Sequence, residues 1–478
     1  MQRVTGVAVA PKTDAMSSDM LHAAAITARI DRLPESRHVW GHVILLALAG
    51  IFEVYDLYQT AYVPLGLVRD GIFSGTDKFL FGLSDQASFA AATFLGLFIG
   101  AIGFAQIADR FGRRPIFVWA LVGYSVATLA MAMQTTATGI YICRLLAGIG
   151  LGIELVTIDA YMVEIVPKHM RGKAAAIIHA ISYLAIPLLA LLAYLLIPID
   201  ARGIAGWRWL VLIGSTGAIA VWWLRARLPE SPRWLAQQCN AEAAERILAP
   251  FEAKIEADLG RNLPVPEWSA PEKHHQAAFA EIWQQPYRSR TIMLMVFNFF
   301  QTIGFFGFTN WLPALLAGQG HSVTKSLLYS AIIAIAFPLW PLLWSFTVAD
   351  RFERKWLIVA ASGVAAILGL IFSFQSSPEL LISFGILLTG ANTLMSFAYH
   401  PYQAELFPTQ IRARAVGFVY SFSRLSTIFT SFMIAFFLQH FGTVGVFCFI
   451  SASMLMVMSS IGIFGPLTRG RSLEEIAQ

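Results

Sequence analysis

Two carboxylates stand in the middle of a long apolar stretch near the start of the chain. Glu53 and Asp56 lie three residues apart within the stretch 39–67, so a helix would place them on one face, with Thr60 one turn further along. A charged carboxylate at mid-membrane costs about 2.5–3.5 kcal/mol, and such acids usually face a protein interior or a wet cavity. We interpret Glu53 and Asp56 as a proton or ligand site on a cavity-lining helix. The alternative is a structural ion pair that locks two helices together.

An arginine occupies another apolar stretch, late in the chain. Arg424 stands about ten residues into the stretch 414–439, hence roughly 15 Å deep in a helix that rises 1.5 Å per residue. The planar guanidinium can bind a carboxylate through two hydrogen bonds. We therefore expect Arg424 to meet an anionic substrate. The alternative is a permanent salt bridge with an acid of the protein.

The composition is that of a membrane protein. Of the 478 residues, 57% are hydrophobic and 13% are charged, against about 25% charged residues in a soluble domain. The basic residues behind the net charge of +5 are scattered through short loops, which does not favour nucleic-acid binding. The three cysteines imply no disulfide framework, and no metal-ligand cluster is evident. We expect a multi-pass, monomeric protein of the cell (inner) membrane, in contact with the lipid bilayer and without metal or cofactor.

The sequence contains twelve apolar stretches long enough to span a bilayer, which takes about 20 residues. They run over 39–67, 87–107, 115–134, 138–166, 173–198, 207–226, 291–317, 326–348, 356–374, 379–407, 414–439 and 442–465. The pattern predicts an all-α membrane protein with twelve transmembrane helices. Prolines at 187, 338 and 341 are expected to kink the fifth and eighth helices.

The same pattern predicts the domains. They are an N-terminal tail 1–38, an N-terminal six-helix bundle 39–226, a central loop 227–290, a C-terminal six-helix bundle 291–466 and a C-terminal tail 467–478. A charged, alanine-rich segment at 240–259 predicts short surface helices within the central loop.

Lysine and arginine predict the orientation, because they concentrate in loops on the cytoplasmic side. An even number of helices puts both tails and the central loop on one side, together with Arg110, Arg113, Arg114, Lys168, Arg171, Lys173, Arg351, Arg354, Lys355, Arg412 and Arg414. The other side holds only Arg69, Lys78, Arg202, Arg208 and Lys325. Both termini, the two tails and the central loop are therefore expected to be cytoplasmic.

A sequence repeat divides the chain into two halves. The segment 108–114 recurs as 349–355, at an offset of 350 − 109 = 241. A second motif shares the offset, since Glu164 recurs as Glu405 and 405 − 164 = 241. Two motifs at one offset indicate two homologous six-helix repeats, with a substrate site near the bilayer midplane between them.

The offset also pairs Asp159 with His400, since 400 − 159 = 241. If both side chains face one cavity from opposite halves, they could share a proton. The alternative is that His400 hydrogen-bonds a backbone carbonyl.

These motifs resemble those of the major facilitator superfamily. The segment 109–114 (Asp-Arg-Phe-Gly-Arg-Arg) is similar to its loop motif after the second helix, with Ala105 in place of the usual leading glycine, and 144–152 resembles its fourth-helix motif. The segment 229–235 (Pro-Glu-Ser-Pro-Arg-Trp-Leu) resembles the signature of sugar porters and of their metabolite:proton symporter relatives.

Two shorter segments resemble particular subgroups. The segment 53–56 (Glu-Val-Tyr-Asp) partly matches the Asp-Gly-x-Asp element of aromatic-acid:proton symporters, and 310–313 (Asn-Trp-Leu-Pro) looks like part of niacin-type transporters. The polar sets that sugar porters carry in helices five and seven are not evident.

The resemblance implies alternating access, with charge pairs at a cytoplasmic gate that hold the outward-facing state. The gate residues would be Asp109, Arg113, Arg114, Glu164, Arg171, Asp350, Arg354, Glu405, Arg412, Glu230 and Arg233. The alternative for these charges is simple positive-inside topology. The resemblance also places Arg144 near the first helix, as a partner for Glu53 or Asp56. The candidates for proton coupling are then Glu53, Asp56, Asp159 and Arg144.

The expected function is proton-coupled symport of a small organic acid or metabolite, with the proton gradient as energy source. The candidate substrate-binding residues are Arg424, Tyr58, Gln301, Asn298, His400 and Asn392. No catalytic arrangement stands at workable spacing, so no enzyme activity is expected. The alternatives are a proton-coupled sugar or polyol porter, a drug-efflux antiporter, or a transport-dead sensor on the same fold.

Overall fold

The described chain is almost entirely helical. The computed structural model describes residues 18–74, 84–201, 203–225, 228–266, 279–348, 351–407 and 409–468. The first elements are α1 (Ser18–Asp31), α2 (Arg37–Arg69), α3 (Asp85–Phe111), α4 (Arg113–Ala132), α5 (Ala137–Ile165), η2 (Lys168–Met170), α6 (Arg171–Ser182), α7 (Ala185–Leu196), β1 (Asp200–Ala201), β2 (Ile204–Ala205) and α8 (Gly206–Arg225). The others are α9 (Pro232–Gln237), α10 (Ala241–Leu259), η3 (Phe279–Trp283), α11 (Tyr287–Thr309), α12 (Leu312–Gly318), α13 (Val323–Ala334), α14 (Ala336–Thr347), α15 (Arg354–Ser373), α16 (Pro378–Glu405) and α17 (Thr409–Phe464).

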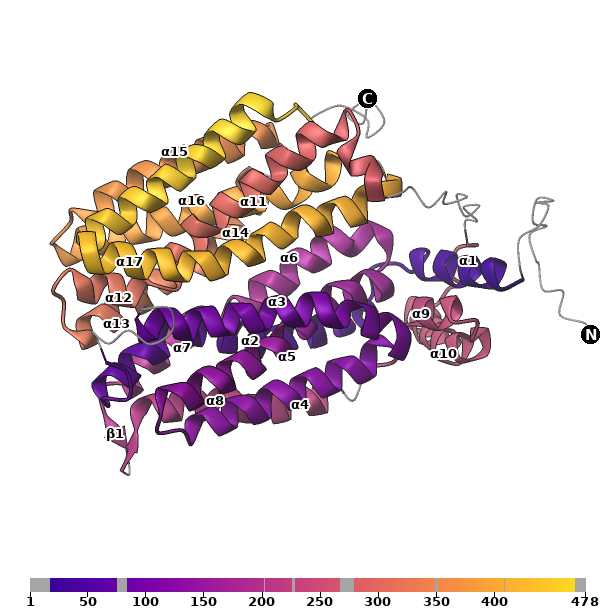
Figure 1. Cartoon of the computed structure of the whole chain (residues 1–478). Coiled ribbons are helices and arrows are strands. Elements are labelled where there is room, and N and C mark those ends of the chain that lie inside the picture. The colour runs from indigo at the N-terminus through magenta and orange to yellow at the C-terminus, as the bar shows by residue number, and fades with distance from the viewer. Residues whose placement is uncertain are drawn as a thin grey trace, which may run out of the picture.

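The helices form two bundles that lie side by side (Figure 1). One contains α2–α8 and the other α11–α17. Helices α1, α9 and α10 lie together beyond one end of the first bundle, and we call them the polar cap and this end the α10 end. The short antiparallel hairpin of β1 and β2 lies at the opposite, hairpin end. The bundles pack through α3 on α17, α7 on α13 and α2 on α12.

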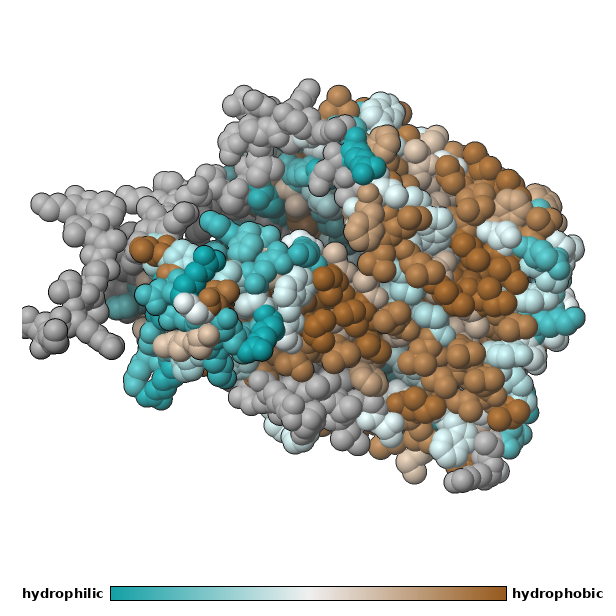
Figure 2. Space-filling model, turned by 180° about the vertical axis from the view of Figure 1, so that it is seen from behind, coloured by the Kyte–Doolittle hydropathy of each residue, from teal (hydrophilic) through white to brown (hydrophobic). Residues whose placement is uncertain are grey.

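Nine helical stretches in the described residues are long and apolar enough to cross a membrane. One of them, Arg414–Phe464, lies in α17, where Gly442 (φ 64°, ψ −166°) interrupts the helical backbone. The predicted boundary between the stretches 414–439 and 442–465 falls at this glycine. Figure 2 shows the apolar side chains over the bundles and the hydrophilic ones over the polar cap. Twelve crossings, the orientation and the predicted domain boundaries stay predictions.

The helix boundaries repeat along the chain. Helix α4 begins at 113 and ends at 132, and α15 begins at 354 and ends at 373, so both differences are 241. Helices α5 and α16 begin at 137 and 378, again 241 residues apart. The offset found in two short motifs therefore extends to whole helices.

Two helices break where prolines predicted a kink. The stretch 171–196 is divided into α6 and α7, and Pro187 is the third residue of α7. The stretch 323–347 is divided in the same way, with Pro338 as the third residue of α14. Proline lacks the N–H that would bond the preceding turn and its ring clashes with a carbonyl there, which explains both breaks.

The polar cap contains one expected helix and one that was not expected. Helix α10 confirms the surface helix predicted at 240–259. Helix α1 lies in the segment predicted only as a tail. Its Ile26 and Ile30 pack against Ala244 and Leu248 of α10, so an apolar stripe docks α1 on the central loop.

Candidate functional site

A buried ion pair joins α2 and α5. Nη1 of the fully buried Arg144 lies 3.3 Å from Oδ1 and 3.4 Å from Oδ2 of Asp56. Nη2 of Arg144 donates to the backbone carbonyl of Asp56 at 3.0 Å, and its Nε donates to Oγ1 of Thr93 on α3 at 3.1 Å. Thr128 of α4 donates to the Asp56 carboxylate at 3.4 Å. Four helices therefore meet at one aspartate–arginine pair.

Close packing of α5 on α3 brings Arg144 to this position. A Cβ added to Gly148 would lie 2.3 Å from the carbonyl oxygen of Thr93, and one added to Gly152 would lie 2.2 Å from that of Leu97. Small residues let two membrane helices approach this closely. Arg144 lies one turn before Gly148 on the same helix face, so the glycines hold its guanidinium against α3.

The acids named for proton coupling differ in their surroundings. Asp56 is the partner of Arg144 that the structure shows. Glu53 is also buried, as is Glu154 of α5. The side chain of Asp159 lies outside the described residues. Because removing one partner of a buried ion pair typically costs about 3–5 kcal/mol, Asp56 needs either Arg144 or a proton as its counterpart.

Arg424 is a half-buried cation in the interior of α17. It lies 424 − 409 = 15 residues from the start of the helix, or about 22 Å along it. Its guanidinium carbon is 5.3 Å from the centre of the Tyr420 ring, one turn earlier. Among the described residues no carboxylate forms an ion pair with Arg424, so its hydrogen-bond donors are left for a ligand.

Aromatic rings from both bundles lie close to Arg424. The ring of Tyr420 is 6.1 Å from that of His400 on α16, which is 5.3 Å from that of Tyr399. Tyr183, at the end of α6, is close enough to Tyr420 and to Tyr58 of α2 for their phenols to interact electrostatically. Arg424 therefore belongs to the region where the two bundles face each other.

His400 makes the hydrogen bond that was the alternative to a shared proton. Its Nδ1 lies 2.8 Å from the carbonyl oxygen of Ser396, one turn earlier on α16. Because the side chain of Asp159 is not described, proton sharing between Asp159 and His400 stays a prediction.

The other residues named for substrate binding vary in accessibility. Asn298 is fully buried, its Nδ2 donating to the carbonyl of Leu294 at 2.9 Å and its Oδ1 accepting from the Tyr399 hydroxyl at 2.6 Å. A substrate would have to displace these bonds. Gln301 is half-buried and donates to a neighbouring hydroxyl at 3.0 Å. Asn392 is buried, and its Oδ1 has no hydrogen-bond partner in the described part of the chain.

Aromatic contacts close the bundles on each other towards the hairpin end. The ring of Tyr58 lies 6.3 Å from that of Phe337 on α14, and that of Phe94 on α3 lies 5.3 Å from that of Phe306 on α11. Tyr58 and Phe306 both stand in the half of their helix that is nearer the hairpin. These rings are contacts between the two bundles in the half of the molecule nearer the hairpin.

Charged side chains gather at the α10 end, where the gate was predicted. Arg354 pairs with Glu405. Nε of Arg171 donates to the carbonyl of Val166 at 3.3 Å, and Nε of its repeat mate Arg412 donates to that of Phe407 at 3.1 Å. Glu405 thus joins the cluster through Arg354, whereas Arg412 bonds the backbone just after α16.

Asp31 of α1 is the acid that sequence reasoning missed. Its Oδ1 accepts from Nη2 of Arg233 at 2.6 Å and from the backbone N–H of Lys168 at 2.9 Å, and it lies 3.7 Å from Nη2 of Arg171. The available signal was the apolar spacing of residues 26, 30 and 33, which is helical. Asp31 links the polar cap to the loop between α5 and α6.

The remaining gate residues surround the loop between α3 and α4. Gly112 has a φ of 97°, which favours glycine, and an added Cβ would lie 2.7 Å from Oε2 of Glu230. Glu230 therefore lies beside this loop. Glu164 is half-buried at the end of α5. The side chains of Asp109, Arg113 and Arg114, and all of Asp350, lie outside the described residues.

Further ion pairs hold the polar cap together and fasten it to the first bundle. Arg29 and Arg32 pair with Glu252 of α10. Nε2 of His38 lies 2.7 Å from Asp258, and the hydrogen bond from Arg37 lowers the pKa of the Asp258 carboxyl below its ordinary value.

Comparisons with known proteins agree with this architecture. The family model described as sugar (and other) transporter matches residues 43–478. The putative metabolite transport protein YyaJ of Bacillus subtilis is 30% identical over 450 residues, which cover 93% of this chain and 96% of that protein. The niacin transporter NiaP of Acinetobacter baylyi is 26% identical, covering 94% of this chain and 99% of that protein.

A solved structure shares the fold. The xylose transporter XylE from E. coli, in a partially occluded inward-open conformation, superposes with a TM-score of 0.72 at 20% identity and covers 91% of this chain and 100% of its own. The chain therefore belongs to the sugar (and other) transporter family of the major facilitator superfamily, and it is a multi-pass membrane transporter of small molecules rather than an enzyme.

Proposed function

We propose that this transporter carries a small organic anion together with a proton by alternating access. The observation that carries the proposal is Arg424, a half-buried guanidinium between the bundles without an acid partner in the described residues. An unpaired charge inside a membrane protein is costly. A carboxylate substrate would remove that cost, because its two oxygens match the guanidinium fork.

The surroundings of Arg424 favour an acid with an apolar body. The ring of Tyr420 lies beside Arg424, and the ring of His400 lies 6.1 Å from that of Tyr420. Niacin, the cargo in the name of one relative, is a carboxylate on an aromatic ring. An aromatic or other compact monocarboxylate is therefore the proposed cargo.

Asp56 is the proposed proton carrier. In the structure it is paired with Arg144, and a proton would free that arginine. A group whose charged partner is present in one state and absent in another changes its affinity for a proton. Movement of α5 relative to α2 would thus couple protonation to the conformational cycle.

The proposed gate lies at the α10 end, which the distribution of lysine and arginine predicts to be the cytoplasmic side. The pairs Arg354–Glu405 and Arg233–Asp31 belong to this end. The aromatic contacts of Tyr58 and Phe94 would then close the opposite side.

Uptake into proteoliposomes with an imposed inward proton gradient tests this proposal. Labelled niacin, benzoate and xylose would be compared for wild type, Arg424→Ala and Arg424→Lys, with the exposed Arg246→Gln of α10 as a control for removal of one positive charge. We expect an acid to accumulate, a protonophore to abolish the accumulation, and Arg424→Ala to reduce uptake at least tenfold. Accumulation of xylose alone, or normal acid uptake by Arg424→Ala, would show that the organic-anion assignment is wrong.

A further inference from the structure

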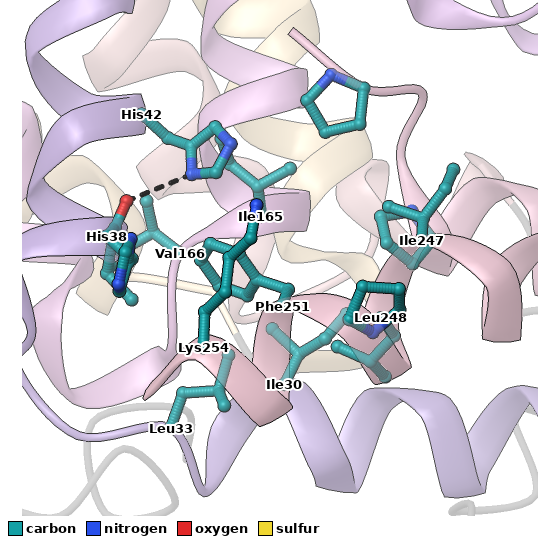
Figure 3. A pocket seen from close by; sticks show the side chains of 14 residues that line it. Ile30, Leu33, His38, His42, Ile165, Val166, Ile247, Leu248, Phe251 and Lys254 are labelled. Carbon is teal, nitrogen blue, oxygen red and sulfur yellow. Dashed lines mark hydrogen bonds between the residues drawn. The ribbon is translucent and has the colours of Figure 1, made fainter. Parts of the chain in front are cut away.

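A cavity of about 380 Å³ lies at the α10 end, and its lining does not include Arg424. Figure 3 shows the side chains that line it. It is lined by residues of α1, the start of α2, the end of α5, the start of α9 with the segment before it, and α10. Most of its lining is apolar, including Ile30, Val39, Ile165, Leu248 and Phe251. Pockets for small molecules commonly have volumes of about 300–1,000 Å³ and apolar walls with a few polar groups. The cavity has the size and the walls of such a pocket.

The few polar groups of the cavity define what it could bind. Nδ1 of His42 lies 3.1 Å from the carbonyl oxygen of His38, as the dashed line in Figure 3 marks. A ring nitrogen that faces a carbonyl donates its proton, so Nε2 of a neutral His42 is left as an acceptor. His38 itself is held by Asp258. Lys254 is exposed, and no carboxylate in the described part of the chain pairs with its ammonium group.

We propose that this cavity is a second ligand site, which binds a small carboxylate with an apolar body. The body would fill the space beside Phe251 and Leu248, and the carboxylate would meet the ammonium group of Lys254. Charge complementarity supports an anion, because no acid among the described residues pairs with Lys254 and the nearby Asp258 is already bound by Arg37 and His38.

An anionic membrane lipid also combines an anionic group with apolar chains. The position of the cavity favours a water-soluble acid over such a lipid. Two residues on α10, Glu242 and Arg246, have side chains that are 79% and 73% exposed, and the polar cap is hydrophilic where Figure 2 shows it. The cavity therefore lies between the polar cap and the end of the first bundle, beside exposed polar residues of α10.

A ligand in this cavity would act on the docking of the polar cap. It would touch α1 and α10 on one side and α2 and α5 on the other. A ligand that binds only the docked arrangement stabilises that arrangement. The site would thus let the concentration of an organic acid control how firmly the cap holds the proposed gate.

Equilibrium binding in a variant without the proposed transport site tests the inference. The full-length chain with Arg424→Ala, in nanodiscs, would be titrated with labelled octanoate and benzoate, and hydrogen exchange of α1 and α10 would be followed. We expect saturable binding of at least one acid and slower exchange of both helices. Added Lys254→Gln should weaken binding at least tenfold, and Arg246→Gln, which removes one charge from the same helix, should leave it unchanged.

A second variant fills the space instead of removing the charge. Ile247→Trp, at a half-buried lining position, should abolish binding while the protein still elutes as a folded monodisperse species. The inference is wrong if the Arg424→Ala protein binds neither acid, or if Lys254→Gln binds as tightly as its parent. It is also wrong if mass spectrometry finds a phospholipid that octanoate does not displace. None of these outcomes bears on transport through Arg424, which the uptake assay measures separately.

Discussion

Replacement of Asp56 by asparagine tests the buried ion pair and the proposed proton carrier together. Asparagine keeps the shape of the side chain and removes its charge, as protonation would. Nη1 of Arg144 would exchange its two carboxylate contacts at 3.3 and 3.4 Å for one contact to the neutral amide oxygen. Arg144 would keep its bonds to the carbonyl of residue 56 at 3.0 Å and to Thr93 at 3.1 Å.

These remaining bonds determine the expected size of the effect. Breaking a buried pair typically costs about 3–5 kcal/mol, and two of the donors of Arg144 stay satisfied, so Asp56→Asn should cost about 3 kcal/mol. That is a change of roughly a hundredfold in the unfolding equilibrium. Arg144→Met leaves the Asp56 charge buried with Thr128 as a donor at 3.4 Å, so it should cost about 5 kcal/mol.

A double-mutant cycle separates the pair from its surroundings. Unfolding by SDS in mixed micelles, followed by tryptophan fluorescence, gives the free energy for wild type, each single variant and the double variant. The double variant should lose at least 1 kcal/mol less than the sum of the singles, because coupled neighbours are non-additive by about 0.5–3 kcal/mol. If the losses in free energy of unfolding were additive, the interpretation that Asp56 and Arg144 stabilise each other electrostatically would be refuted.

Transport by the same variant tests the proton role. Asp56→Asn should lose proton-driven accumulation yet keep exchange of labelled for unlabelled substrate, since exchange needs no net proton movement. A variant that accumulates substrate like wild type would refute Asp56 as the carrier.

Three further predictions concern packing and the polar cap. Gly152→Ala should reduce the yield of folded protein, because its Cβ would meet a backbone carbonyl of α3 at 2.2 Å. The control Gly123→Ala, whose Cβ meets nothing within 4 Å, should not reduce that yield. Size-exclusion profiles compare the two variants. Asp31→Asn should speed hydrogen exchange in α1 and α9 severalfold, while Glu35→Gln, at an exposed pair, should change it little; equal effects would contradict the special role of Asp31. The pKa of Asp258 is lowered in the folded protein. Its contribution to stability is therefore present above its ordinary pKa of about 3.9 and is lost as pH falls through the lowered value. Hydrogen exchange of α10 should accelerate on acidification, and Asp258→Asn should remove that part of the pH dependence.

The membrane helices could be predicted because their cause is local. A run of apolar residues must form helix in a bilayer, where each backbone polar group needs a partner within the segment. The breaks at Pro187 and Pro338 follow from the chemistry of one residue each. Helix α1 was missed because its 14 residues are too few to span a bilayer, and its burial depends on α10, more than 200 residues away in sequence.

The partners of charged residues were harder to predict for the same reason. Arg144 could have met either acid of α2, and the close approach of α5 to α3 at Gly148 decides where its guanidinium lies. Asp31 was missed because its three partners come from η2, α6 and α9, which only the folded chain brings together. Periodicity places a residue on a face, whereas long-range packing decides what that face meets.

The sequence repeat makes the distribution of charges between the bundles informative. At the offset of 241, Arg144 corresponds to Gly385, Asp56 to Phe297 and Arg424 to Tyr183. Each charged group therefore occurs in only one half, although α5, which carries Arg144, begins 241 residues before its counterpart α16.

If Asp56 carries the proton and Arg424 binds the anion, proton binding and anion binding belong to different bundles. Coupling must then cross the interface between them, where Tyr183 of the first bundle lies close to Tyr420 of the second. Tyr420 lies beside Arg424, and Tyr183 occupies the position that corresponds to Arg424 in the other half. A change at this interface, such as Tyr183→Ala, should uncouple proton flow from substrate uptake while both sites stay intact, because it leaves Asp56, Arg144 and Arg424 in place. Uptake with unchanged proton-to-substrate ratio in that variant would show that coupling takes another route.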